Sequence, residues 1–526
     1  MRWAAFLLVV MTVTVLASDR YPPPRFTDPA RVATLMSAMP EVDRVFRVYA
    51  ADKKLPGMVW GVVIDDRIAH LGTFGVRDRA SQTPVTADTV FRIASMTKSF
   101  TALAVLRLRD EGRLSLEDPV SRWIPAFASL ERPTLDTPPL TIRQLLSHSA
   151  GFPEDNPWGD QQLSATDAMM DAWLARGIPF STPPGTRYEY SNYAFGLLGR
   201  IVTAASGVPY EQYVRTAVLA PLKMGDSTFE FSDVAPARRA VGYRLEPAGT
   251  YSEEPPLPHG VFGAMGGLLT TANDLGKYVA FQLSAWPPRD DDDRGPVRRS
   301  SVREMAHMWT PSNLTAQLFE GRTQASVTGY GYGLRVTADC RFDHIVAHGG
   351  SLPGFGSYMA WLPEYGVGIF AMATLTYSGP SEAVNQAWDA LLRTHALRKR
   401  EWPPTARQIE IRSHLLNLWN RWNESEAADI AAVNLFLDTP SAQRQAEIQA
   451  LRSEVGACTA AGPVLPENWM RGQFNLTCER GTVGVFFTLA PTEPPAVQHL
   501  AFRKLASPDE RMVAPTGAPA GVACRP

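Results

Sequence analysis

Ser95 and Lys98 are the two residues whose types and spacing point most directly to chemistry. A serine hydroxyl is a poor nucleophile at neutral pH and needs a base within hydrogen-bond reach. Residues three apart lie on one face of a helix, so we expect the amine of Lys98 beside the hydroxyl of Ser95. Apolar residues recur at helical spacing from Phe100 to Leu108, which predicts that Ser95 opens a helix ending near Gly112. The free amide groups and positive dipole end of such a helix favour an oxyanion.

A second interpretation of Ser95 is a helix N-cap, a common position for serine. A Ser-x-x-Lys match can also arise by chance. Lysine is scarce in this chain, however, and only Lys98 has a serine three residues before it. On these residues alone the two interpretations are balanced, and the remaining partners must decide between them.

The composition limits the classes of function. A chain of 526 residues is too long for one core, so two or three domains are expected. The formal net charge is −2, and no basic stripe or sustained charge block indicates a nucleic-acid partner. No Cys-x-x-Cys or His-Glu-x-x-His pattern occurs, so neither a metal nor another cofactor is predicted. The sequence leaves the oligomeric state open.

Residues 1–17 have the pattern of a signal peptide. Arg2 is the positive end, an apolar run follows from Ala4 to Leu16, and small residues at Val15 and Ala17 suit cleavage after Ala17. The alternative is a buried helix or an anchor, but the apolar run is too short to span a bilayer comfortably. No other stretch is long and apolar enough, so we expect an exported protein, periplasmic or secreted, with no membrane span in the mature chain.

Export would also permit disulfides between the four cysteines, Cys340, Cys458, Cys478 and Cys524. Four cysteines allow three pairings. The local pair Cys458–Cys478 is favoured, which leaves Cys340 for Cys524.

The elements that must position Ser95 follow from periodicity and turn residues. Helices are predicted over residues 29–53, 141–146, 193–205, 210–219 and 381–397, and strands over 58–64, 68–74, 330–336, 345–347, 356–362 and 367–375. The small residues of 263–269 indicate a flexible segment that suits close backbone approach. Composition changes near residues 399–404, so the predicted domains are 24–400 and a small C-terminal α+β module over 401–526, with helices in 409–453 and strands in 472–503.

Several stretches together resemble the serine β-lactamase and DD-peptidase superfamily, on its class C side. They are residues 95–98, Tyr190-Ser191-Asn192, the Gly266-Gly267 region and His348-Gly349-Gly350, with residues 144–151 as a further signature. Their order and spacing match across about residues 30–397. The resemblance implies an α/β (α+β) fold in which an antiparallel sheet is flanked by helices and joined to an all-helical subdomain. The C-terminal module lies outside it.

The resemblance implies that Ser95 is the acylated nucleophile, Lys98 its proton partner and Tyr190 a general base and acid. A free tyrosine has a pKa of about 10, so we expect the nearby Lys98 to favour the phenolate. The alternative for Tyr190 is a core aromatic with a bonded hydroxyl. His148 is interpreted as structural, capping the short helix before it.

The same resemblance implies the substrate contacts. The Asn192 amide would hold a substrate carbonyl and orient Lys98, although Asn192 could also be the N-cap of the following helix. His348, Gly349 and Gly350 would end a strand along the cleft. The amide of Ser351 on this strand, together with that of Ser95, would form an oxyanion hole.

His348 departs from the lysine that β-lactamases of the family usually carry. Histidine is mostly neutral at pH 7, which weakens carboxylate recognition. We therefore predict a serine hydrolase that forms an acyl-enzyme with a small-molecule or peptide ester or amide. Esterase or D-peptidase activity is favoured over β-lactamase activity. The alternative is a non-catalytic protein that binds or senses peptidoglycan fragments on the same scaffold.

Overall fold

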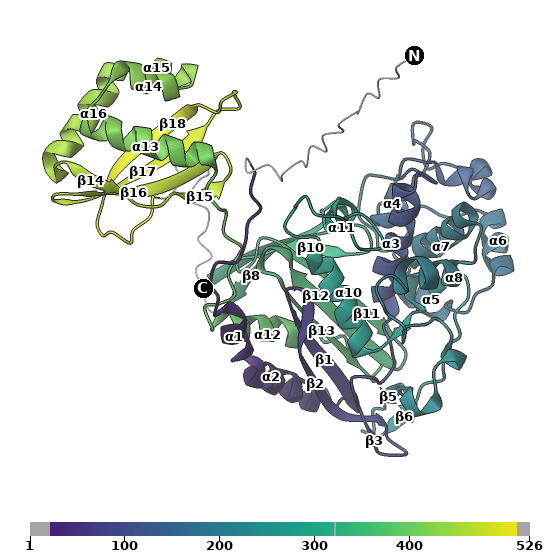
Figure 1. Ribbon diagram of the computed structural model, residues 1–526. Coiled ribbons are helices and arrows are strands. Elements are labelled where there is room, and N and C mark those ends of the chain that lie inside the picture. The colour runs from purple at the N-terminus through teal and green to yellow at the C-terminus, as the bar shows by residue number, and fades with distance from the viewer. Residues whose placement is uncertain (1–20, 320–321, 513–526) are drawn as a thin grey trace, which may run out of the picture. The chain divides into compact units, whose positions relative to one another are not determined.

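The computed structural model describes residues 21–319 and 322–512 (Figure 1). The described chain forms two compact units: residues 28–399, and a smaller unit made of residues 21–27 with 400–512. The predicted signal peptide and Cys524 lie outside the described residues. Within the described ranges, no helix combines the length and the apolar character needed to cross a bilayer.

The larger unit is built on a nine-stranded antiparallel sheet. Its strands run in the order β3 (Thr83–Pro84), β2 (Arg67–Asp78), β1 (Gly57–Ile64), β13 (Val367–Ala373), β12 (Phe355–Leu362), β11 (Ile345–Leu352), β10 (Arg335–Ala338), β9 (Arg322–Tyr330) and β8 (Thr310–Phe319). Two small pairs accompany it, β4 (Phe91–Arg92) with β7 (Leu269–Thr270), and β5 (Tyr243–Leu245) with β6 (Tyr251–Glu253).

The helices of this unit are α1 (Arg31–Met36), α2 (Met39–Asp52), α3 (Thr97–Asp110), α4 (Ile142–Leu146), α5 (Asn156–Gln161), α6 (Asp167–Arg176), α7 (Asn192–Ser206), α8 (Tyr210–Val214), α9 (Gly263–Gly266), α10 (Ala272–Ser284), α11 (Arg299–Met305) and α12 (Ser381–Leu392). Helices α3 to α8 form a helical region beside the sheet (Figure 1).

The central strands are buried on both faces. Along β1, Met58 and Trp60 pack in the core with α2 and α12, whereas Val59 and Val63 pack in the core with α3 and α10. Because successive side chains of a strand point to opposite faces, one apolar run serves both cores. The predicted fold, an antiparallel sheet flanked by helices with a helical region, is confirmed.

Several local predictions differ from the structure. The helix predicted over 29–53 is two helices, because Pro40 lies in the first turn of α2 and has no amide hydrogen with which to continue α1. The strand predicted over 330–336 is interrupted at 331–334, where Gly333 has φ 66°. Strand β8 and most of β9 were not predicted.

The smaller unit packs four helices on a five-stranded sheet. The helices are α13 (Ala406–Asn420), α14 (Glu424–Ile430), α15 (Val433–Asp438) and α16 (Ser441–Val455). The strands run β14 (Cys458–Ala461), β16 (Arg471–Cys478), β17 (Gly481–Leu489), β18 (Val497–Leu505), with β15 (Leu465–Asn468) also on β16. Cys458 lies opposite Cys478 in the sheet and forms the predicted disulfide with it. Arg25 pairs with Glu401, which joins the first described residues to this unit.

Candidate active site

Ser95 lies in a turn that leads into α3. The preceding residue, Ala94, has φ 48°, a left-handed conformation that non-glycine residues rarely adopt. The turn is a single 3-10 turn, and α3 itself begins at Thr97 without a side-chain cap from Ser95. The N-cap interpretation of Ser95 is therefore wrong, and its hydroxyl is left for another partner.

That partner is Lys98, whose side chain has no exposed surface. Its Nζ atom lies 3.0 Å from Oγ of Ser95, 2.7 Å from Oδ1 of Asn192 and 2.9 Å from the carbonyl oxygen of Met265. The last two atoms can only accept hydrogen bonds. In a neutral amine the two N–H groups would satisfy them, and the nitrogen lone pair would face the hydroxyl of Ser95.

The charge state of Lys98 is set by its surroundings. Burial lowers its pKa to about 7, because the charged amine loses its hydration. The carboxylates of Asp160 and Asp155 oppose this shift, whereas the guanidinium of Arg335 adds to it. The lysine that faces the serine is thus placed to exchange a proton near neutral pH.

Tyr190 covers the same amine with its ring. The Nζ atom of Lys98 lies 4.8 Å from the ring centroid, and the Ser95 hydroxyl is near enough to the Tyr190 hydroxyl to oppose the rise in its pKa. Burial raises the pKa of Tyr190 well above its usual range. The prediction that Lys98 favours the phenolate is therefore wrong, because the cation faces the ring rather than the oxygen. Tyr190 carries its proton, which it can donate.

Asn192 begins α7, and its segment is held by Asp155. The backbone amides of Asn192 and Tyr193 donate to the Asp155 carboxylate over 2.6 and 2.8 Å. The N-cap of α7 is Ser191, whose hydroxyl accepts from the amide of Ala194 over 3.1 Å. Asn192 is therefore not the cap, and its side chain is free to accept from Lys98.

His148 supports this segment from behind. Its ring is fully buried, 4.3 Å from that of Tyr190 between centroids, and its Nδ1 atom accepts from the amide of Ser191 over 3.1 Å. Burial lowers its pKa well below the usual value, so the ring is neutral. The cap of the short helix is Ser147 rather than His148, but the side chain does hold the Tyr190 segment in place.

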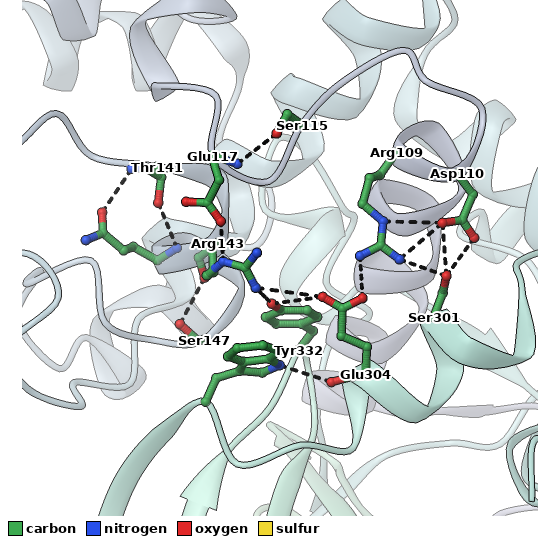
Figure 2. Close-up of polar contacts among 12 residues, drawn as sticks. Arg109, Asp110, Ser115, Glu117, Thr141, Arg143, Ser147, Ser301, Glu304 and Tyr332 are labelled. Carbon is green, nitrogen blue, oxygen red and sulfur yellow. Dashed lines mark hydrogen bonds and ion pairs between the residues drawn. The ribbon is translucent and has the colours of Figure 1, made fainter. Parts of the chain in front are cut away.

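A polar network anchors the short helix α4, which carries this support. Figure 2 shows Arg143 of α4 between Glu117 and Glu304, with Tyr332 beneath it. The guanidinium donates to Glu117 over 2.5 Å and to the hydroxyl of Tyr332. The neighbouring Gly333 approaches the backbone of Lys98 so closely that a Cβ there would lie 2.5 Å from its carbonyl oxygen. The contact between Arg143 and Tyr332 therefore holds the segment whose next residue, Gly333, packs against Lys98.

Strand β11 forms the opposite side of the site. A Cβ on Gly350 would lie 2.0 Å from the carbonyl oxygen of Ile93, so only glycine lets this strand approach the Ser95 turn. Ser357 of β12 donates to the same carbonyl over 2.9 Å. Gly350 therefore permits the close approach of the strand to the nucleophile turn.

His348 of β11 is buried within the strand side of the site. Its side chain is 2% exposed, its Nε2 atom lies 2.8 Å from the hydroxyl of Tyr330, and its Nδ1 atom lies 2.6 Å from the carbonyl oxygen of Gly349. Because that carbonyl can only accept, Nδ1 carries the hydrogen and Nε2 accepts from Tyr330. Burial lowers the pKa of His348, so it brings no charge to the cleft.

A cavity of about 520 Å³ opens between the two sides. Of the predicted site residues it is lined by Ser95, Tyr190, His348, Gly349, Gly350 and Ser351. Lys98 and Asn192 lie buried beneath it, in contact with each other. All eight predicted residues therefore line this cavity or lie directly beneath it.

The sequence analysis missed two features of this site. Arg335 of β10 lines the cavity and places its guanidinium 5.8 Å from the ring centroid of Tyr190. The carboxylates of Asp155 and Asp160 lie within the electrostatic reach of Lys98. The sequence signal for these acids was the segment 154–160, which is rich in acidic and turn-forming residues and follows the signature ending at Gly151.

The family follows from a sequence comparison. A model of the Beta-lactamase family matches residues 42–394, about two thirds of the chain. The chain belongs to this family. Membership supports a hydrolase of the serine type, and the class C assignment stays an interpretation.

Curated relatives match only in part. Beta-lactamase-like protein 2 of Dictyostelium discoideum is 32% identical over 292 residues, which are 54% of this chain and 52% of that protein. Protein flp of Staphylococcus aureus (strain COL) is 27% identical over 341 residues, 64% of this chain and 63% of that protein. The chain thus matches between half and two thirds of these relatives' lengths.

Solved structures support the fold. A penicillin-binding protein from Bacillus halodurans aligns with a TM-score of 0.50 at 25% identity, over 67% of this chain and 98% of its own. The octameric penicillin-binding protein homologue from Pyrococcus abyssi aligns with a TM-score of 0.58 at 24% identity, over 86% of this chain and 96% of its own.

Proposed function

We propose that the protein hydrolyses an ester or amide through an acyl-enzyme on Ser95. The observation that carries this proposal is the contact of 3.0 Å between Nζ of Lys98 and Oγ of Ser95, made by an amine whose other partners can only accept hydrogen bonds. Such an amine takes the hydroxyl proton as Oγ bonds to the substrate carbonyl carbon.

The remaining steps use groups already at the hydroxyl. The carbonyl oxygen becomes an oxyanion, held by the backbone amides of Ser95 and Ser351. The Tyr190 hydroxyl, which lies near Ser95, donates its proton to the departing alkoxide or amine. Solvent that enters the cleft as the leaving group departs then carries the proton of Lys98 to Tyr190. Water then attacks the acyl group by the reverse path and releases the acid.

Arg335 supports a substrate that carries a carboxylate. Its guanidinium lines the cavity beside Tyr190, whereas His348 is neutral and engaged with Tyr330. A guanidinium suits a carboxylate because it can donate two parallel hydrogen bonds. We therefore favour substrates with a free carboxylate, namely anionic esters and peptides with a free carboxyl terminus, including D-amino-acid peptides. β-Lactams carry the same group, so Arg335 does not discriminate against them. We also propose that the protein acts outside the cytoplasm, as the N-terminal pattern indicates.

Labelling with a fluorophosphonate probe, followed by peptide mass spectrometry, tests the nucleophile. We expect label on Ser95 and none in the Ser95→Ala variant. Label on another residue, or equal labelling of both proteins, would reject the assignment. A parallel panel of p-nitrophenyl esters, nitrocefin and D-Ala-D-Ala peptides then separates esterase, β-lactamase and peptidase activity from binding without turnover.

A further inference from the structure

Asp160 is a buried acid that the proposed steps do not use. It lies on α5, its side chain is 4% exposed, and its Oδ1 atom is buried without a hydrogen-bond partner. An unsatisfied carboxylate oxygen inside a protein is costly, since the charged form loses its hydration. A nearby positive charge is the usual compensation.

Helix α5, which carries Asp160, packs directly against Asn192, the residue that accepts a hydrogen bond from the amine of Lys98. Gly159 lies so close to Asn192 that a Cβ would come within 2.7 Å of both the Cβ and the Nδ2 atoms of Asn192. Nδ2 of Asn192 also donates to Oδ1 of Asn156 over 3.2 Å, while its Oδ1 accepts from Lys98. The helix that carries Asp160 is therefore fixed to the amide that orients the Lys98 amine.

Asp155 provides the contrast. Each of its carboxylate oxygens accepts a hydrogen bond from a backbone amide, that of Asn192 or that of Tyr193. These donors compensate the negative charge of Asp155, which thereby holds the start of α7. Oδ1 of Asp160 has no such donor. Its field acts on Lys98 through space, because the N–H groups of that amine face other atoms.

We propose that Asp160 is a positioning residue for acylation: its buried carboxylate is the counter-charge for the ammonium that forms when Lys98 takes the proton of Ser95. The inference rests on the proposed function. The proton moves from Oγ of Ser95 to Nζ of Lys98 as the Oγ–carbon bond forms, so positive charge develops on a fully buried amine. A fixed negative charge there stabilises that state and strengthens the amine as a base.

The other charged and titratable groups around the pair are consistent with this role. Burial raises the pKa of Asp160 to about 6, and the field of Lys98 opposes the rise. Of the groups facing the lysine, Arg335 disfavours its charged form, and both His148 and His348 are neutral. Asp160 is further influenced by Asp155 and Glu154. Asp160 and, to a smaller extent, Asp155 are thus the groups that favour the charged form of Lys98.

The test is the pH dependence of Ser95 labelling by a fluorophosphonate probe in the full chain. In the unmodified protein the rate should rise as Lys98 loses its proton, with a midpoint near its pKa of about 7. Asp160→Asn removes the charge with little change of shape. Since the carboxylate raises the pKa of Lys98, its removal should move the midpoint to lower pH by about one unit.

Matched variants separate charge from structure. Asp160→Glu keeps the charge and should keep the midpoint. Asp171→Asn removes an acid from an exposed site on α6, and it should change neither the midpoint nor the rate. If Asp160→Asn and Asp160→Ala slow labelling equally at every pH with an unchanged midpoint, the role is structural and the inference is overturned.

Two further outcomes are distinguishable. No label on Ser95 at any pH in the unmodified protein ends the proposed function and the inference together, whereas labelling with an unchanged midpoint in the neutral variants ends only the inference. Should the neutral variants fail to fold, NMR titration of isotope-labelled lysine in the unmodified protein replaces them. The Lys98 signal should then show a second inflection from the carboxylate, and a single independent titration would overturn the inference.

Discussion

The cleft has two walls that differ in how they are built. The helical wall, formed by α3, α5, α9 and the start of α7, holds a buried amine, one buried and one half-buried acid and a protonated tyrosine around Ser95. The strand wall, formed by β10, β11 and β12, offers backbone and a neutral histidine, with one cation at Arg335. Under the proposed mechanism, proton transfer is concentrated on the helical wall, whereas recognition of substrate shape and charge depends on the strand wall. Changes on the two sides should therefore affect different kinetic constants.

The largest effect should come from the helical wall, in Tyr190→Phe. Loss of the hydroxyl removes the proposed proton donor to the leaving group, so acylation should slow by about 10² to 10⁴-fold. The measurement is the acylation rate with a D-Ala-D-Ala peptide, whose amine must be protonated as it leaves. Tyr210→Phe is the matched control, because Tyr210 is also buried and its hydroxyl lies 2.7 Å from that of Thr101 on α3, the helix that carries Lys98. Near-normal acylation by Tyr190→Phe would remove that hydroxyl from the mechanism.

The next effect should come from moving the walls apart with Gly350→Ala. The added methyl would lie 2.0 Å from the carbonyl oxygen of Ile93, so β11 must shift away from the Ser95 turn. A displacement of about 1 Å in such a site can cost roughly 10²-fold in rate. Gly349→Ala, on the adjacent residue, meets only the Tyr358 ring at 3.3 Å and should cost much less in kcat/KM. Equal losses in the two variants would contradict the close-approach argument.

A smaller and selective effect is expected from Arg335→Gln on the strand wall. Loss of one charged hydrogen-bonding partner corresponds to about 1.5–3 kcal/mol, so KM for a carboxylate substrate should rise about 10- to 100-fold. The comparison uses mono-p-nitrophenyl succinate and p-nitrophenyl pentanoate, which have similar lengths and differ in charge. The neutral ester should be almost unaffected. An equal change for both esters would show that Arg335 does not recognise the carboxylate.

The smallest effect concerns the turn where the walls meet. Ala94 has φ 48°, a conformation that glycine adopts without strain, so Ala94→Gly should raise the free energy of unfolding by about 0.5 kcal/mol. Thermal unfolding measures this change. Ala102→Gly, in the regular part of α3, should instead lower stability by about 1 kcal/mol or more. Destabilisation by Ala94→Gly would indicate that the left-handed turn is not a strained one.

The parts of the site that could be predicted are those with local or ordered signals. Lys98 faces Ser95 because three residues of helix separate them, and Tyr190, Asn192 and His348 follow from the order of motifs along the chain. Arg335 and Asp160 could not be predicted in the same way. Arg335 lines the cavity and Asp160 acts on Lys98 through space, and neither periodicity nor residue type marks such an arginine or aspartate in the sequence.

The fold shows the same division between patterned and unpatterned segments. Strands such as β1 have continuous apolar runs and were predicted, whereas β8 has no continuous apolar run and only a short alternation of polar and apolar residues that begins at Asn313. Residues 263–269 were predicted to be flexible because they are small. In the structure, residues 263–266 form the buried helix α9, whose Met265 carbonyl accepts from Lys98. Small size there permits tight packing, which composition alone does not distinguish from mobility.

The pairing of Arg25 with Glu401 has a consequence for biosynthesis. Thr27 adds a second link by donating to the Glu401 carboxylate over 2.9 Å, so the smaller unit holds residues from both sides of the larger one. Translation delivers the first partner long before the second. The smaller unit can therefore complete its assembly only after the ribosome has produced the entire intervening segment. The larger unit is thus an insertion within the smaller one, and the chain enters and leaves it at neighbouring residues of the smaller unit.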